Sequence, residues 1–168
     1  MSPATAGRGF LLIALALACF ALSPTPQAFG VTPPPDGGYA NNNTAEGFDA
    51  LLSLTSGTDN TANGTDALER NTTGSFNTAT GAGALVENTI GLNNTAIGFE
   101  ALFSNTIGAN NTANGSSALV ENTTGFDNTA AGANALLNNT TGANNTANGF
   151  QALNRNTTGN FNTANGVE

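Results

Sequence analysis

The hydrophobic and polar residues of this chain recur with one fixed period of seventeen residues, from about Asn42 to the end. Each unit reads N-T-A-x-G-x-x-A-L-x-x-N-T-T/I-G-x-x, and we number its positions one to seventeen. Every unit opens with Asn, Thr, Ala, any residue and Gly, and the opening residues are Asn43, Asn60, Asn77, Asn94, Asn111, Asn128, Asn145 and Asn162. A strict short period predicts that each unit stacks on its neighbour as one coil of an elongated rod.

The recurring residue types indicate which positions face the interior of a coil. Leu at position nine is the only large apolar residue in every complete unit, so we expect a continuous inward Leu stripe, with Ala at positions three and eight filling the thin parts. Asn recurs at positions one and twelve (Leu54 replaces it once), which predicts stacked amide ladders in which each side chain donates to the next coil. Thr favours pleated strand because it is β-branched. Gly at positions five and fifteen predicts corners where the backbone needs positive φ.

We therefore predict an all-β fold, a parallel β-solenoid or β-roll of seven to eight coils, about 36 Å long at roughly 4.8 Å per coil. The N-T-A-x segment predicts a strand. The segment from position six to ten stays open between a second strand and a single helical turn. Phe48, Leu51 and Leu52 have the i, i+3, i+4 spacing of a helix, and so do Phe99, Leu102 and Phe103. Asn-Gly pairs such as Asn63-Gly64 also occur in two-residue hairpins, but the register favours corners. So thin an interior favours packing of several chains.

The part of the chain before the repeats has a different composition. Residues 1–28 predict a signal peptide, with Arg8 in the n-region and Ala28 at the cleavage site. Its apolar run of 13 residues is shorter than the roughly 20 that a membrane span needs. Cys19 either leaves with this signal or is acylated as in a lipoprotein. Residues 29–41 predict a Pro/Gly-rich linker and residues 42–168 the solenoid. Because the chain stops seven residues into the eighth unit, we expect either a longer protein or a partner that covers this end.

The charge excludes several classes of partner. The chain has three basic residues, eleven acidic residues and no His, for a net charge of −8. Such a chain cannot neutralise a phosphate backbone, so we expect no nucleic-acid partner and no attraction to anionic membranes. Without His, and with Cys19 as the only Cys, zinc sites and the usual nucleophilic triads are not expected either.

The acidic residues do not form a recognisable constellation. Asp49, Asp66 and Glu100 share position seven, but uncharged residues occupy that position in the other complete units. This pattern favours a solvated, variable face, with calcium binding as the less favoured alternative. We predict no catalytic residue, no cofactor and no metal, and therefore no enzyme.

The clearest copy of the unit is N-T-A-I-G-F-E-A-L-F-S-N-T-I-G, from Asn94 to Gly108. It resembles the head repeats of trimeric autotransporter adhesins, which carry an N-S-V-A-I-G-like core and form a left-handed parallel β-roll of three packed chains. It is similar also to the N-T-A-I-G-Y-Q-A-L-type repeats of bacterial exported and phage tail-fibre-like proteins, in which an intramolecular chaperone often follows. The resemblance covers residues 42–168. It implies a bacterial, secreted or cell-surface module of adhesin type, homotrimeric and non-catalytic, that presents a long repetitive surface.

The Thr column at position two is the candidate binding surface, and its members are Thr44, Thr61, Thr78, Thr95, Thr112, Thr129, Thr146 and Thr163. If these residues face solvent, position four does too, because strand side chains alternate. If they face the core or a trimer axis, they are structural. The resemblance favours the inward orientation, whereas the polarity of position four, where Ile97 alone matches the apolar residue of those families, favours the outward one. An outward column indicates the alternative function, a monomeric solenoid whose flat Thr ladder binds ice or a polysaccharide.

Overall fold

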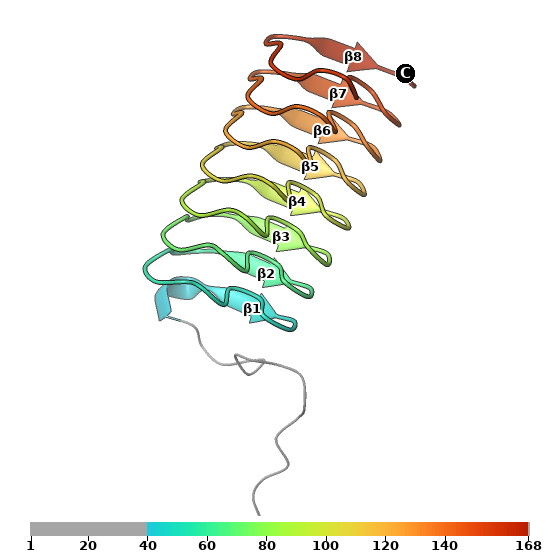
Figure 1. Ribbon diagram of the computed structural model, residues 1–168. Helices are drawn as coiled ribbons and strands as arrows, with labels where there is room; N and C mark the ends of the chain where they lie inside the picture. The colour runs from blue at the N-terminus through green and yellow to red at the C-terminus, as the bar shows by residue number, and fades with distance from the viewer. Residues whose placement is uncertain (1–39, 168) are drawn as a thin grey trace, which may run out of the picture.

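The structure, a computed structural model, describes residues 40–167, which wind into an elongated stack of similar coils (Figure 1). A short 3-10 helix, η1 (Ala40–Asn42), precedes the first strand. Each coil contributes one three-residue strand: β1 (Thr44–Glu46), β2 (Thr61–Asn63), β3 (Thr78–Thr80), β4 (Thr95–Ile97), β5 (Thr112–Asn114), β6 (Thr129–Ala131), β7 (Thr146–Asn148) and β8 (Thr163–Asn165). The predicted signal peptide, Cys19 and nearly all of the predicted linker lie outside the described residues.

The eight strands form one parallel sheet in the order β1 to β8, and each strand pairs with the strand seventeen residues further along. Thr112 faces Thr129, Ala113 faces Ala130 and so on through every pair. This confirms the predicted all-β parallel solenoid and its seventeen-residue register, with Asn-Gly pairs at coil corners rather than in hairpins. The register is strongly specified, because a slip of one residue would turn the buried Ala of each strand toward solvent.

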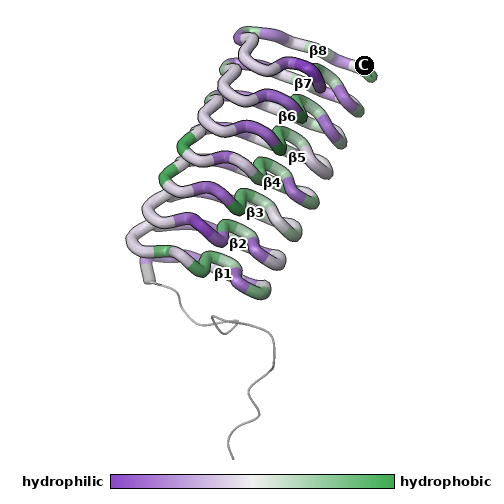
Figure 2. Tube along the Cα trace, viewed as in Figure 1, coloured by the Kyte–Doolittle hydropathy of each residue, from purple (hydrophilic) through white to green (hydrophobic). Residues whose placement is uncertain are grey.

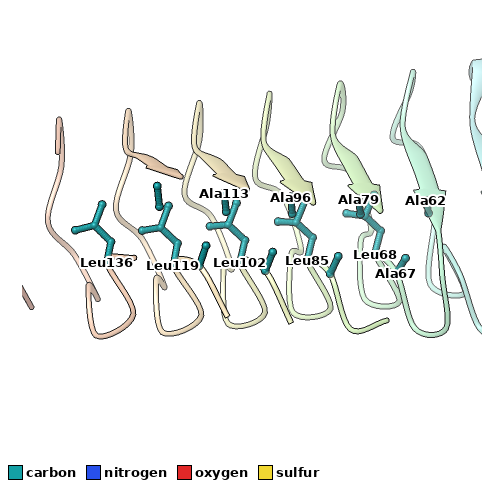
Figure 3. Close-up of a cluster of buried hydrophobic side chains, with 14 of the residues drawn as sticks. Ala62, Ala67, Leu68, Ala79, Leu85, Ala96, Leu102, Ala113, Leu119 and Leu136 are labelled. Atoms are coloured by element: carbon teal, nitrogen blue, oxygen red, sulfur yellow. The ribbon is translucent and has the colours of Figure 1, made fainter. Parts of the chain in front are cut away.

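The interior is a column of Leu flanked by Ala, as the sequence predicts (Figure 3). Leu68, Leu102 and Leu136 are completely buried, and so are the alanines at positions three and eight of the central coils. In the last coils Leu153 and Ala164 are only partly buried. The same succession of hydrophobic and hydrophilic stretches repeats from coil to coil (Figure 2). Since the Leu column is buried within a single chain, it is not available as the core between several chains.

Two buried ladders of asparagine amides run along the rod. In the first, at position one, Asn111 Nδ2 donates to Asn94 Oδ1 at 3.2 Å and to Gly125 O at 2.8 Å. In the second, at position twelve, Asn122 Nδ2 donates to Asn105 Oδ1 at 2.9 Å and to the same Gly125 carbonyl at 3.1 Å. The predicted ladders are confirmed, although each amide donates to the preceding coil and not to the next. No buried side-chain N or O atom of the described residues lacks a partner.

The segment that follows each strand forms neither a second strand nor a helical turn. It consists of consecutive turns in which positions seven and nine have positive φ, for example 55° at Glu100 and 53° at Leu102. Its backbone bonds to both adjacent coils, since Glu100 N donates to Ala82 O and Leu102 N to Ala118 O, both at 3.0 Å. The segment also keeps bonds of turn type within itself, such as Phe103 N to Glu100 O at 3.3 Å, so the hydrogen bonds between coils add to the local ones.

The two recurrent glycines have different physical roles. At position five, φ lies between 119° and 146°, as expected for a corner. At position fifteen, the expected positive φ is wrong, because none of the positive-φ glycines occupies that position. Gly is needed there for space: a Cβ on Gly108 would collide with Asn105 Oδ1 and with the carbonyl oxygen of Gly125 in the next coil.

Candidate recognition surface

The Thr column at position two lies on the outer face of the sheet. In β1 to β7 the middle residue, Ala, is buried, while the Thr before it and the residue after it face outward. Six of the eight threonines are exposed, and Thr78 and Thr95 are half-buried. Neighbouring threonines pair directly across the sheet, as Thr112 and Thr129 do, at the strand spacing of about 4.8 Å. Of the environments left open by the sequence, the structure excludes the interior of the chain itself and places the column on its outer face.

The hydroxyls of this column are available to an outside partner. The chain has a second Thr column, at position thirteen, whose hydroxyls are used internally: Thr106 Oγ1 donates to Thr123 O and Thr123 Oγ1 donates to Thr140 O, at 3.0 and 3.1 Å. The position-two hydroxyls make no such bond to any other residue in the described part of the chain. Two Thr columns that are equivalent in the sequence are therefore distinct in the structure, and only the first can offer all its hydroxyls to a ligand.

We define the Thr face as the Thr column at position two together with the column at position four. Position four holds Glu46, Asn63, Thr80, Ile97, Asn114, Ala131, Asn148 and Asn165, and all but Ala131 are exposed. Along a strand the two columns are about 6.7 Å apart. Among these strand residues, Glu46 carries the only charge. The face is therefore flat, regular, polar and almost neutral, which suits an extended neutral surface better than an ionic partner.

The acidic residues that the sequence offers as metal ligands do not come together in the structure. Among residues 40–167, no group of three or more His, Cys, Asp and Glu side chains could hold a metal ion. Asp49, Asp66 and Glu100, all at position seven, are half-buried. Asp49 and Asp66 lie on adjacent coils, and Glu100 lies two coils further along. None of the helices in the same range has both the length and the apolar character needed to cross a bilayer.

Two exposed aromatic residues, Phe48 and Phe99, have a role other than the one that their spacing predicts. Phe48 and Phe99 suggested helical spacing, but each ring lies at the turn after a strand and is about half exposed, at 49% and 55%. The signal that could have identified them as a surface feature is their recurrence at every third coil. By contrast, no signal in the sequence separates the two Thr columns, because only the fold decides which hydroxyl reaches a carbonyl.

Comparison of the chain with protein-family models, with curated proteins and with solved structures gives no match. The function is therefore inferred from the geometry of the Thr face and from the sequence itself.

Proposed function

We propose that this chain is a non-catalytic repeat module of adhesin type, exported and displayed at the cell surface, that attaches through the Thr face to an extended polar surface. The observation that carries this proposal is the outward column of eight threonines, whose hydroxyls have no partner among the described residues. A rigid stack of identical coils repeats one weak contact in register, and repeated weak contacts on one scaffold combine into strong attachment.

Two further features support a structural role. The fully buried polar side chains are asparagines held in ladders, so the buried polar groups stabilise the rod and are not available for proton transfer. The charged side chains in the described part are spread over the outer positions and do not meet in one place. Both features suit a scaffold that presents a surface rather than a site for chemistry.

Export is the part of this proposal that is simplest to test. We expect the mature protein to begin at Phe29, because Ala28 fits the cleavage position of a signal peptide. N-terminal sequencing of the protein recovered from producing cells, with immunogold labelling of intact cells, checks both claims. An intact Met1 together with label confined to the cell interior would contradict export. A mature chain that begins at an acylated Cys19 would instead establish the lipoprotein alternative, which keeps the surface location.

The resemblance to adhesin heads implies a trimer, an assembly that is an alternative to the antiparallel pair of chains argued below. Because Leu102 and its equivalents are buried within one chain, a trimer would have to form through an outer face. Light scattering coupled to size exclusion gives the mass of the particle in solution, and a value three times that of one chain would establish the trimer.

A second candidate function, binding of ice or of a crystalline polysaccharide by a free rod, is favoured by the spacing of the Thr hydroxyls. Two water molecules bound tetrahedrally to a common third, at O···O distances of about 2.8 Å, lie about 4.5 Å apart. The column presents hydroxyls about every 4.8 Å, close to that distance. A hydroxyl row with this spacing can join an ordered water lattice or the hydroxyl rows of a packed polysaccharide.

A further inference from the structure

Position six of the repeat has a second, longer period. It holds Phe48, Thr65, Ala82, Phe99, Ser116, Ala133, Phe150 and Val167. With the coil that begins at Asn43 counted as coil one, Phe recurs in coils one, four and seven, about 14 Å apart along the rod. The three rings are 49%, 55% and 49% exposed. Since Ala, Ser and Thr occupy the same backbone position in the intervening coils, the coil itself does not require Phe there.

The Phe residues belong to a continuous strip of side chains, which we call the turn edge and define as positions six, seven, ten and eleven of all coils. The turns after the strand arrows stack along one side of the rod (Figure 1). Positions seven and ten of adjacent coils touch: Asn154 Nδ2 donates to Asn134 O at 3.3 Å, and the Phe103 ring lies 3.6 Å from the place where Gly83 would carry a Cβ. In the middle of the strip, position ten is apolar, with Val86, Phe103 and Val120.

Charge is distributed unevenly along the turn edge. The first three coils carry four carboxylates there: Asp49, Asp66, Glu69 and Glu87. Arg70 is the one basic residue among them, and its Nη1 lies 2.6 Å from Glu87 Oε2. Coils six and seven carry no carboxylate at these positions, which hold Asn134, Leu137, Asn138, Gln151, Asn154 and Arg155. Coils four and five carry one carboxylate each, Glu100 and Glu121. The negative charge is therefore concentrated in the first coils of the strip, and the last coils carry one positive charge.

We propose that the turn edge binds the turn edge of a second copy of this chain in antiparallel orientation, with the two-fold axis beside Phe99. Phe48 and Phe150 lie the same number of residues to either side of Phe99, so this symmetry places each Phe against a Phe of the second copy. Exposed aromatic pairs of this kind are favourable in offset or edge-to-face contact. An interface with two-fold symmetry is isologous, which means that the same strip of each chain forms both of its sides.

Charge selects the antiparallel orientation over the parallel one. A parallel pair would also match Phe with Phe, but it would place Asp49 and Asp66 against the same carboxylates of the second copy. The antiparallel pair places Asp49 opposite the coil that holds Gln151 and Arg155. Like charges at close range are unfavourable and opposite charges favourable, which suppresses the parallel arrangement. Two approaches of like charges remain in the antiparallel pair. Glu87 approaches Glu121 of the second copy, but Arg70 already neutralises Glu87. Glu100, next to the two-fold axis, approaches Glu100 of the second copy, and the parallel pair would bring the same two residues together.

The strip is narrow, so the pair is weak and concentration-dependent. Rods projecting from two opposing surfaces meet in this antiparallel orientation, so the second copy becomes an adhesion partner. That consequence rests on the proposed surface display, whereas the pairing itself does not. Two separate measurements test the two proposals: retention on a solid surface tests the Thr face, and self-association in solution tests the turn edge. One proposal can therefore be wrong while the other holds.

Sedimentation equilibrium of the purified chain over a wide concentration range tests the pairing. We expect a monomer–dimer equilibrium that is weakened at least tenfold in a triple variant, Phe48→Thr, Phe99→Ser and Phe150→Thr. These replacements are the residues that position six already carries in other coils, so the circular dichroism and unfolding midpoint should be unchanged. The matched control removes two exposed rings elsewhere, Phe76→Asn and Phe161→Asn, at a position where other coils hold Asn, and it should dimerise normally.

The orientation is tested by disulfide trapping in a Cys19→Ser background. Chains carrying Asp49→Cys are mixed with chains carrying Gln151→Cys and exposed to a mild oxidant. The proposal predicts mainly the mixed disulfide, which joins one chain of each kind. Disulfides formed mainly between two chains that carry the same substitution would overturn it. A monomer at all concentrations, a trimer, or unchanged dimerisation of the triple Phe variant would each overturn it as well.

Discussion

Replacing Asn111 by Leu is expected to lower the stability of the rod by about 2–6 kcal/mol. Asn111 Oδ1 accepts from the backbone N–H and from the side-chain amide of Asn128, both at 3.1 Å. Leu has the same number of side-chain heavy atoms and the same branch at Cγ but no acceptor, so two buried donors of Asn128 lose their partner, at about 1–3 kcal/mol for each orphaned group. The carbonyl of Gly125 would keep a donor, Asn122. Denaturant unfolding followed by circular dichroism measures the change.

The matched control is Asn114→Leu, in the same coil. Asn114 lies at the outward position four and is exposed, so its replacement should change the stability by no more than about 0.5 kcal/mol. Equal unfolding midpoints for the two variants would contradict the assignment of the buried ladder as a main source of stability.

The isosteric variant Asn111→Asp adds a dependence on pH. At neutral pH a buried carboxylate would face two acceptors, Asn94 Oδ1 and Gly125 O, so this variant should be less stable than Asn111→Leu. Burial raises the pKa of such a carboxyl above its unfolded value of about 3.9. The destabilisation is therefore full above the folded-state pKa and decreases as the pH falls toward the unfolded value. An Asp variant whose deficit relative to the unmodified chain does not shrink on acidification would be inconsistent with this account.

Replacing Gly115 by Ala is the second change with a large expected effect. Gly115 has φ of +146°, and a Cβ would lie 2.6 Å from the carbonyl carbon and oxygen of Gly132 and 2.9 Å from Ala133 N. The obstacle is backbone of the next coil, so coils five and six must move apart. Backbone strain of about 1–3 kcal/mol and overpacking of about 1–3 kcal/mol together give a loss of about 2–6 kcal/mol in the free energy of unfolding.

Gly83→Ala is the control for this prediction, since Gly83 also has positive φ, at +71°. There the nearest atoms are the Glu100 side chain at 3.3 Å and the Phe103 ring at 3.6 Å, which can adjust. Other coils hold Asp, Glu or Ser at the same position with φ between 54° and 59°, so we expect a cost of no more than about 1 kcal/mol. Thermal unfolding of both variants separates crowding between coils from loss of glycine's conformational freedom. Similar midpoints would show that crowding is not the reason for Gly at position five.

Much of the fold follows from recurrence alone. A fixed seventeen-residue period determines which residues stack, and Leu at position nine is the only side chain large enough to form an interior column. The Asn ladders follow from the same logic, since identical amides in stacked coils can satisfy one another. These predictions need only the spacing of residues, and the structure confirms them.

The segment after each strand could not be predicted because stacking overrides local preference. Phe99, Leu102 and Phe103 have helical spacing, yet Leu102 adopts φ of 53°, a conformation that L residues with long side chains rarely take. The position is stabilised by contacts that a single unit does not contain: Leu102 is fully buried in the column and its N–H donates to Ala118 O. A local pattern cannot show hydrogen bonds to the neighbouring coil.

The orientation of the Thr face was undetermined for a related reason. Alternation along a strand says that positions two and four share a face, but not which face is inside. Small Ala and β-branched Thr both fit a thin interior. The structure places Ala113 inside and Thr112 outside, which joins Thr112 to the polar residues of position four. The free hydroxyls of this column, in contrast to those of Thr123 and its equivalents, could not be read from the sequence at all.

Retention of the purified chain on insoluble surfaces tests most directly whether the Thr face is the recognition surface. The probes are polycrystalline ice, microcrystalline cellulose and chitin. The test variant carries Thr112→Tyr and Thr129→Tyr in the middle of the face, and the control carries Thr124→Tyr and Thr141→Tyr, exposed threonines at position fourteen of the same two coils. We expect the unmodified chain and the control to be retained on at least one probe, and the test variant to lose at least tenfold in retention with its fold intact. No retention of the unmodified chain on any probe, or equal retention of both variants, would contradict the account.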